Sequence, residues 1–149
     1  MKKLLTILCL VLLVSCSNEI PSDKLVERQG VTYQVNSEKP FTGTSVEYYL
    51  DTIIKDEFED RVLWKRTTYK DGVLDGLYES FHPNGQTEIR DNYKNGELDG
   101  LRENFRENGQ LWIKHNYKKG YPEGLSEIFH ENGQLQGTGN FIDGKKDGL

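Results

Sequence analysis

The sequence predicts an all-β protein, an elongated single-layer antiparallel sheet of stacked 24-residue β-hairpin repeats. One observation is that the same residues recur at an interval of 24 over the second half of the chain. Another is that short runs of alternating apolar and polar residues are separated by Asn-Gly or Asp-Gly pairs, which is typical of hairpins. A single hairpin cannot bury its own apolar side, so the copies are expected to stack. The interval is marked by Tyr69, Tyr93, Tyr117 and Phe141, each followed by two glycines and a leucine.

The first residues have the order of a secretory signal, with Lys2 and Lys3 followed by an apolar run over 4–14 and a small residue. At about 1.5 Å per residue this run is too short to span a bilayer core of about 30 Å as a helix. The sequence Leu13-Val14-Ser15-Cys16 resembles the lipobox of bacterial lipoproteins. The resemblance implies a signal peptide at 1–15 and a lipidated Cys16, with palmitate as one acyl group. It also implies a cell-envelope protein anchored in the inner or the outer membrane. The alternative is a plain secretion signal that contains a cysteine.

Charge and cysteine content narrow the possible partners. The chain has 19 basic and 24 acidic residues, and cleavage after residue 15 removes two lysines, so the net charge changes from −5 to −7 (17 basic against 24 acidic). An acidic protein of this kind is not expected to bind nucleic acid or anionic lipid as its main partner. Because Cys9 leaves with the signal peptide, only Cys16 remains, and no disulfide within one chain is possible.

After the signal peptide, residues 16–24 are expected to be a tether, and residues 25–149 to form the repeat domain. Val31, Tyr33 and Val35 alternate as in a short strand that would cap the first repeat. An acidic insertion of about nine residues, around 51–60, indicates a longer hairpin loop in a divergent first copy. The repeats are expected near 41–68, 69–92, 93–116 and 117–140, with a partial copy at 141–149 that leaves the C-terminal edge of the sheet unpaired.

The strand register depends on the turn at each Asn-Gly pair. A three-residue loop with a type I turn and a left-handed glycine sets Phe81 opposite Thr87, whereas a two-residue loop sets it opposite Glu88. We expect the three-residue loop, because it gives the more uniform apolar face. The other face would be mostly charged. The predicted apolar face contains Leu77, Phe81, Leu101, Phe105, Ile113, Leu125 and Phe129, together with Tyr69, Tyr93 and Tyr117.

The repeated pattern Tyr-x-x-Gly-x-x-x-Gly-Leu, followed by Glu, an aromatic residue and Asn-Gly, resembles the variant MORN repeat of bacteria over residues 41–149. The segment from Lys39 to Gly43 resembles the usual start of the first repeat. Proteins with these repeats, often lipoproteins, resemble the family labelled YwqK-type antitoxin of toxin-antitoxin systems. The resemblance implies binding to proteins, dimerisation or, in some cases, contact with phospholipid head groups, and it does not imply catalysis.

Two columns of ionisable residues are candidate chemical sites. Glu79, Glu103 and Glu127 recur at the repeat interval, on the same side as the Leu and Phe columns. Equivalent residues in adjacent hairpins are about 9 to 10 Å apart, too far to share one metal ion. We expect these carboxylates to bind turn amides or to pair with Lys or Arg. His82 and His130 are two repeats apart and are expected to be surface residues. No catalytic residue, metal ligand or cofactor is predicted.

Trp64 and Trp112 share a column on the face opposite the Leu and Phe columns, and they are the candidate binding residues. The alternative is that their rings only cover neighbouring strands of a thin sheet. The expected function is a membrane-anchored, non-catalytic protein-interaction or scaffold module at the cell envelope, with a protein partner whose identity is open. The alternatives are an antitoxin-like protein that binds a toxin, and a binder of cell-wall glycan.

Overall fold

The computed structural model describes residues 19–49 and 62–147. The predicted signal peptide, the predicted lipidation site Cys16 and the acidic insertion at 51–60 lie outside these ranges. Within them, no helix has the length and apolar character needed to cross a membrane.

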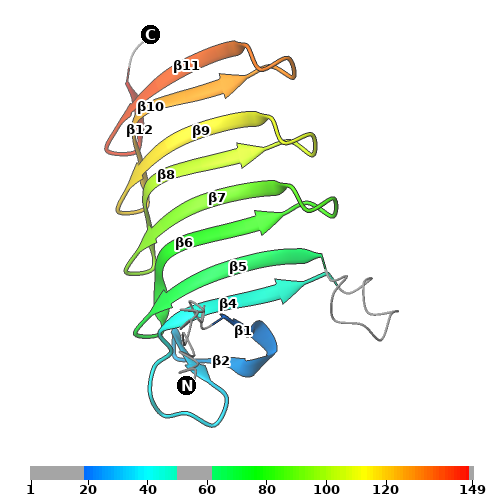
Figure 1. The fold of residues 1–149 in the computed structure, drawn as a ribbon. Helices are drawn as coiled ribbons and strands as arrows, with labels where there is room; N and C mark the ends of the chain where they lie inside the picture. The colour runs from blue at the N-terminus through cyan, green and yellow to red at the C-terminus, as the bar shows by residue number, and fades with distance from the viewer. Residues whose placement is uncertain (1–18, 50–61, 148–149) are drawn as a thin grey trace, which may run out of the picture.

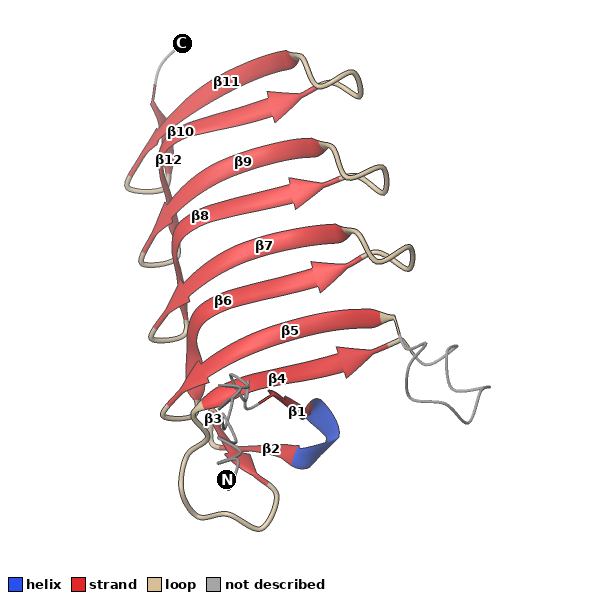
Figure 2. Ribbon diagram, in the orientation of Figure 1, coloured by secondary structure: helices blue, strands red, loops and turns tan. Residues whose placement is uncertain are grey.

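The repeats form one long antiparallel sheet of consecutive hairpins, as the sequence predicts (Figure 1). Ten strands pair in the order β1-β4-β5-β6-β7-β8-β9-β10-β11-β12, and only the β1–β4 pair is parallel. The Asn-Gly loops lie along one side of the sheet and the tight turns along the other (Figure 2). The strands are β1 (Glu19–Pro21), β4 (Gly43–Tyr48), β5 (Leu63–Lys70), β6 (Val73–Phe81), β7 (Thr87–Lys94), β8 (Glu97–Phe105), β9 (Leu111–Lys118), β10 (Tyr121–Phe129), β11 (Leu135–Ile142) and β12 (Lys145–Asp147).

The N-terminal segment is folded onto the first repeat. β1 pairs with β4, and a 3-10 turn, η1 (Ser22–Lys24), leads into a separate hairpin of β2 (Leu25–Arg28) and β3 (Val31–Gln34). The strand predicted from the alternation of Val31 and Tyr33 is therefore confirmed. The prediction of a tether is wrong from Glu19 onward, because these residues extend the sheet and an Arg66 side chain pairs with Glu19 at 3.2 Å.

The C-terminal edge of the sheet also differs from the expectation, which was that it would be unpaired. β12 pairs with Asn140–Ile142 of β11, so this end of β11 is covered by a short strand. All three residues of β12 are exposed and two are lysines, a composition that disfavours pairing with another chain. The described part of the chain therefore has a partly covered edge rather than a bare one.

The predicted register at the Asn-Gly loops is confirmed. Phe81 lies opposite Thr87, and the loop is closed by the His82 N–H donating to the Gln86 carbonyl at 2.8 Å. The Gly85 N–H donates to the His82 carbonyl at 2.8 Å, and Gly85 has a φ of 82°, as a type I turn followed by a left-handed glycine requires. The same pairing recurs at Phe105 with Leu111 and at Phe129 with Leu135.

One residue further along, a β-bulge changes which face the side chains occupy. Ser80 lies opposite Ile89 rather than Glu88, so one extra residue in β7 moves every later side chain of that strand to the other side. The prediction that the tyrosines and Ile113 share a face with the Leu and Phe columns is therefore wrong. We call the two sides the leucine face (Leu77, Leu101, Leu125, Phe81, Phe105 and Phe129) and the tyrosine face (Tyr69, Tyr93, Tyr117 and Ile113).

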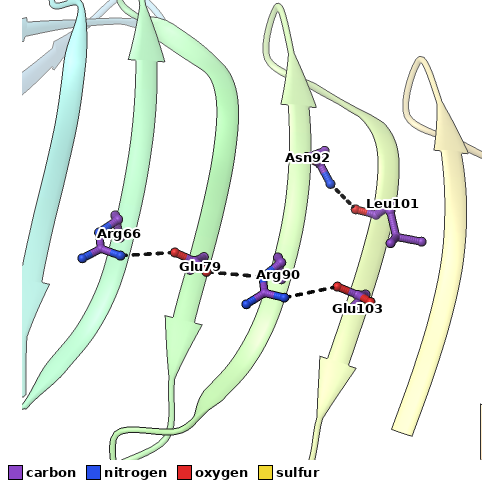
Figure 3. Close-up of polar contacts among 6 residues, drawn as sticks. All are labelled: Arg66, Glu79, Arg90, Asn92, Leu101 and Glu103. Carbon is purple, nitrogen blue, oxygen red and sulfur yellow. Dashed lines mark hydrogen bonds and ion pairs between the residues drawn. The ribbon is translucent and has the colours of Figure 1, made fainter. Parts of the chain in front are cut away.

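The glutamate column lies on the leucine face, as predicted, and the arginines that pair with it lie there too, so the expectation that the opposite face is the mostly charged one is wrong. Glu79 accepts from Arg66 and from Arg90, each at 3.3 Å, and Arg90 continues to Glu103 at 3.6 Å (Figure 3). Glu127 pairs with Lys114 at 3.4 Å. The predicted pairing of the glutamate column with Lys and Arg is thus confirmed. The ion pairs connect β5, β6, β7 and β8 in series, and they connect β9 to β10.

Hydrogen bonds at the tight turns connect each repeat to the one before it. The Gly96 N–H donates to the Leu74 carbonyl at 2.7 Å, and the Gly120 N–H donates to the Leu98 carbonyl at 2.8 Å. An acidic side chain of the earlier repeat accepts from the residue before the glycine: Asp75 from the Asn95 N–H at 3.1 Å, Asp99 from the Lys119 N–H at 3.3 Å and Glu123 from the Asp143 N–H at 3.0 Å. Among the described residues, only Phe41 and Val46 are buried apolar residues. These hydrogen bonds therefore contribute a larger share of the stability than they would in a protein with a large hydrophobic core.

Replacement of Asp99 by alanine is expected to lower the free energy of unfolding by about 1 kcal/mol, the net contribution of one hydrogen bond. The Lys119 N–H would then lose its side-chain acceptor. Urea denaturation followed by tryptophan fluorescence measures the change. Glu97→Ala is the matched control, because Glu97 is exposed and has no hydrogen bond or ion pair among the described residues. Equal losses in both variants would contradict the role of Asp99.

Candidate binding face

The tyrosine face has a central row of small and polar side chains. Directly paired residues on successive strands place Thr67, Tyr78, Asp91, Arg102 and His115 in one line across β5 to β9. Thr67 and Asp91 are only 4% and 2% exposed, although the sheet is a single layer.

The N-terminal hairpin closes one end of the tyrosine face. A hollow of about 300 Å³ lies between Leu25 and Val26 of β2 and the sheet residues Thr67, Tyr69 and Tyr78. Burial raises the pKa of the Tyr69 hydroxyl, although the charge of Lys65 and a hydrogen bond with Ser45 act in the opposite direction. Tyr69 is therefore a neutral hydrogen-bonding group in this hollow.

Trp64 is the extra residue of a bulge in β5, and its ring lies next to Lys65, which lines the hollow of the tyrosine face together with Tyr69. Its ring centre is 6.1 Å from that of Tyr49, and the Lys65 ammonium lies 4.7 Å above it. The Tyr49 hydroxyl donates to the Phe81 carbonyl of the next repeat at 2.6 Å. Trp64 is 39% exposed, so a large apolar ring is held in place and still faces solvent.

Trp112 is built into the sheet in the same way. The Arg106 guanidinium lies 5.4 Å from its ring centre and also donates to the Phe129 carbonyl of the next repeat at 3.0 Å. Trp112 is 43% exposed. β5 and β9 are four strand spacings apart, about 19 Å, so the structure does not bring the two tryptophans together. In the position between them Glu88 accepts from the Ser80 hydroxyl at 3.0 Å.

His82 and Arg106, which share a repeat column with His130, have a structural role that the sequence did not reveal. His82 Nε2 lies 3.1 Å from the Phe105 carbonyl, in the same relation that Arg106 has to Phe129. Since a carbonyl only accepts, His82 must carry its proton on Nε2 in this contact. The interpretation of His82 as a plain surface histidine is therefore incomplete, because its ring connects two repeats. The sequence signal for this role was that these residues directly follow the repeated Phe.

Asp91, Arg102 and His115 form a polar cluster that was not predicted. Arg102 Nε lies 3.5 Å from Asp91 Oδ1, which makes no hydrogen bond, and the buried His115 Nδ1 also has no hydrogen-bond partner. Burial raises the pKa of Asp91, and the charge of Arg102 partly offsets this effect. Burial and the charge of Arg102 both lower the pKa of His115. The lowered pKa favours a neutral His115 imidazole beside the Asp91–Arg102 pair.

The pKa of His115 predicts a pH dependence of stability. Its pKa in the folded protein is below the ordinary value of 6.5, so below that pH the unfolded chain binds more protons than the folded one. The free energy of unfolding is therefore expected to fall as the pH drops from about 7.5 to 5.5. His115→Thr, which introduces the residue found at the equivalent position 67, should reduce this fall. Urea denaturation at both pH values measures it, and an unchanged fall in the variant would contradict the prediction.

Comparisons with known proteins identify the repeats. No curated protein shows a similar sequence. Among solved structures, a point mutant of S. aureus TarM in complex with Fondaparinux, alpha-GlcNAc-glycerol and UDP is 14% identical with a TM-score of 0.39. The match covers 83% of this chain but only 21% of that one, about a fifth of its length, and at this TM-score it supports no conclusion. Three consecutive segments, residues 74–95, 98–119 and 122–143, which span β6 to β11, match the family model described as MORN repeat variant.

Proposed function

We propose that this protein is a lipid-anchored, non-catalytic interaction module of the cell envelope that binds a protein through its tyrosine face. MORN repeats are generally protein- or membrane-interaction modules. The observation that carries the proposal is the presence of two exposed tryptophans, Trp64 and Trp112, at equivalent positions of one face. Tryptophan is among the residues that contribute most to protein interfaces.

The way in which the two rings are held favours binding. Each tryptophan packs against a side chain that is itself bonded to the backbone of the next repeat: Tyr49 to the Phe81 carbonyl, and Arg106 to the Phe129 carbonyl. A ring that is already fixed loses little conformational entropy when a partner covers it. Rings about 19 Å apart fit within one interface of ordinary size, about 800 Å² on each partner.

The two tryptophans provide the test of a protein partner. Cross-linking in intact cells followed by mass spectrometry should identify one abundant envelope protein with the wild-type chain. Trp64→Ala with Trp112→Ala should reduce its recovery at least tenfold, whereas Tyr121→Ala, which removes an aromatic ring that is 65% exposed and lies outside the tryptophan column, should not. The thermal unfolding curve of each variant shows whether the fold is kept. Equal recovery with the folded double variant would overturn the proposal.

The proposed anchor places the sheet close to the membrane. β1 begins at Glu19, three residues after Cys16, and three extended residues reach about 10 Å. On this proposal the hairpins project from a membrane surface, with the first repeat nearest to it. Cys16→Ser should move the protein from the membrane fraction to the soluble fraction of lysed cells. Its persistence in washed membranes would contradict lipid anchoring.

The antitoxin interpretation is a narrower form of the same proposal, in which the protein partner is a toxin. It predicts that cells survive expression of a toxin encoded next to this protein only when both are exported to the same compartment. The same pair of tryptophan substitutions should then abolish the rescue. Rescue by a variant confined to the cytoplasm would contradict the envelope location.

A further inference from the structure

The hollow beneath the N-terminal hairpin is lined from two sides and is open to solvent. Leu25, Val26 and Glu27 of β2 contribute to one wall, and the strands β4, β5 and β6 of the long sheet contribute to the other. Its volume of about 300 Å³ is at the lower end of the range for small-ligand pockets. The hollow is therefore large enough and accessible enough for a short aliphatic chain with one polar end.

Aromatic and aliphatic side chains line the sheet side of this hollow. Leu74 and the half-buried rings of Tyr69 and Tyr78 lie there. At the position of Tyr78 the two following repeats have Arg102 and Ser126, so only the first repeat places a second tyrosine beside the tyrosine column. The combination of two phenol rings with aliphatic side chains is thus specific to the part of the sheet beneath the hairpin.

The charged groups of the hollow leave it with one unbalanced negative charge. The Lys65 ammonium lies 2.7 Å from a Glu47 carboxylate oxygen, so these two charges compensate each other. Glu27 has no ion pair or side-chain hydrogen bond within residues 19–49 and 62–147. Burial raises the pKa of the Tyr69 hydroxyl, and the charges of Glu27 and Glu47 raise it further, which indicates that both carboxylates lie near that hydroxyl. Glu27 is therefore a carboxylate of the hollow that no cation balances.

We propose that this hollow binds an alkylammonium group, the chemistry that a lysine side chain and a free diamine share. An ammonium donates hydrogen bonds, and the Glu27 carboxylate and the Tyr69 hydroxyl oxygen both accept them. The rings of Tyr69 and Tyr78 attract a cation, and the methylene groups of the ligand cover Leu25 and Leu74. An anion would be repelled by Glu27, and an uncharged apolar ligand would take this carboxylate out of water without a partner.

Two sources can supply the alkylammonium group. One is a lysine side chain of the protein partner, and this source rests on the proposed function. It would enter next to Trp64, whose ring centre is 4.7 Å from the ammonium of Lys65 in the lining of the hollow. The other source is a free diamine, which needs no protein partner. Failure of the amine site and failure of the protein contact can therefore be distinguished.

Titration with two amines tests the site directly. The full chain, purified in detergent, is titrated with cadaverine and with lysine whose α-amino and carboxyl groups are blocked. Nuclear magnetic resonance of the tyrosine side chains follows the binding, and we expect both amines to shift the ring signals of Tyr69 and Tyr78 until saturation. The same blocked lysine acetylated on Nζ carries no charge and should bind about tenfold more weakly or less.

Substitutions of the charged residues should change the affinity in opposite directions. Glu27→Gln should weaken amine binding about tenfold, because a hydrogen bond to a charged acceptor is lost. Lys65→Met should strengthen it, because it removes the competing cation and leaves the Glu47 carboxylate free. Glu38→Gln is the matched control, since it makes the same change at an exposed residue of the N-terminal segment outside the hollow, and it should bind normally.

Carbodiimide cross-linking, which joins a carboxylate directly to an amine, distinguishes the two sources. A bond between Glu27 and a lysine of the protein partner would assign the group to that partner, whereas amine binding without this bond would assign it to a free amine. The proposal is wrong if neither amine shifts the ring signals of Tyr69 and Tyr78, or if the acetylated lysine binds as tightly as the charged one. It is also wrong if folded Glu27→Gln binds the amines as well as the wild-type chain does.

Discussion

Arg102→Ala is expected to lower the free energy of unfolding by about 3 kcal/mol, the size of effect seen when one member of a buried ion pair is removed. Asp91 would keep its buried carboxylate and lose its charged partner. The large effect comes from this uncompensated charge rather than from the attraction within the pair. Urea denaturation at pH 7, followed by tryptophan fluorescence, measures it.

Two further variants separate this explanation from a general loss of packing. Asp91→Thr with Arg102→Tyr removes both charges and should be at least as stable as the wild-type protein, because the same two residues already fill positions 67 and 78. Arg90→Ala breaks ion pairs of an arginine side chain that is 42% exposed and should cost only a few tenths of a kcal/mol. If Arg102→Ala costs no more than Arg90→Ala, or if the double variant is as unstable as Arg102→Ala, the explanation is wrong.

Gly72→Ala is expected to destabilise the protein by about 3 kcal/mol, for two reasons that add. Gly72 has a φ of +81°, where a residue with a Cβ is strained by about 1 kcal/mol. A Cβ there would also lie against Val31 Cγ1 and 2.8 Å from the Thr32 carbonyl oxygen, and overpacking of this kind costs about 1 to 3 kcal/mol. Gly72 accepts from the Thr32 N–H at 2.8 Å, so the N-terminal hairpin must shift away.

Gly120→Ala is the matched control, because Gly120 occupies the same turn position with a φ of +80° and nothing lies within 4 Å of its Cβ. This variant should lower the free energy of unfolding by only about 1 kcal/mol, the cost of the strained backbone conformation. Denaturation curves give both values, and hydrogen exchange at the Thr32 amide reports on the hairpin. Equal losses at Gly72 and Gly120, with Thr32 exchange unchanged, would show that the hairpin does not contact this turn as described.

The 24-residue period and the Asn-Gly pairs were enough to predict the hairpins, their stacking and the pairing of each Phe with its partner. The bulge was not predictable from these signals. Leu111 and Ile113 are both apolar, so the apolar pattern of this strand is compatible with a regular strand and also with a strand that has a bulge at Trp112. The parallel pairing of β1 with β4 was missed as well, because it joins segments about 25 residues apart and has no local sequence pattern.

The binding face was predictable only in part. Trp64 and Trp112 could be found because both interrupt the same repeat column with a large ring. Asp91 and Arg102 are ordinary charged residues until the register places them opposite each other. Their signal was present in the sequence, since Asp91 replaces Thr67 and Arg102 replaces Tyr78 at the repeat interval, but it becomes visible only when the columns are compared by burial.

The bonds between the tight turns give the sheet a modular length. Because each repeat is bonded only to its neighbours, duplication or deletion of 24 residues would lengthen or shorten the sheet by about 10 Å without disturbing the other copies. The distance between Trp64 and Trp112 can therefore change in evolution only in whole steps of that size. A partner that contacts both rings would bind only chains with the matching distance between the two tryptophans. Chains with one repeat more or fewer between them would bind less well.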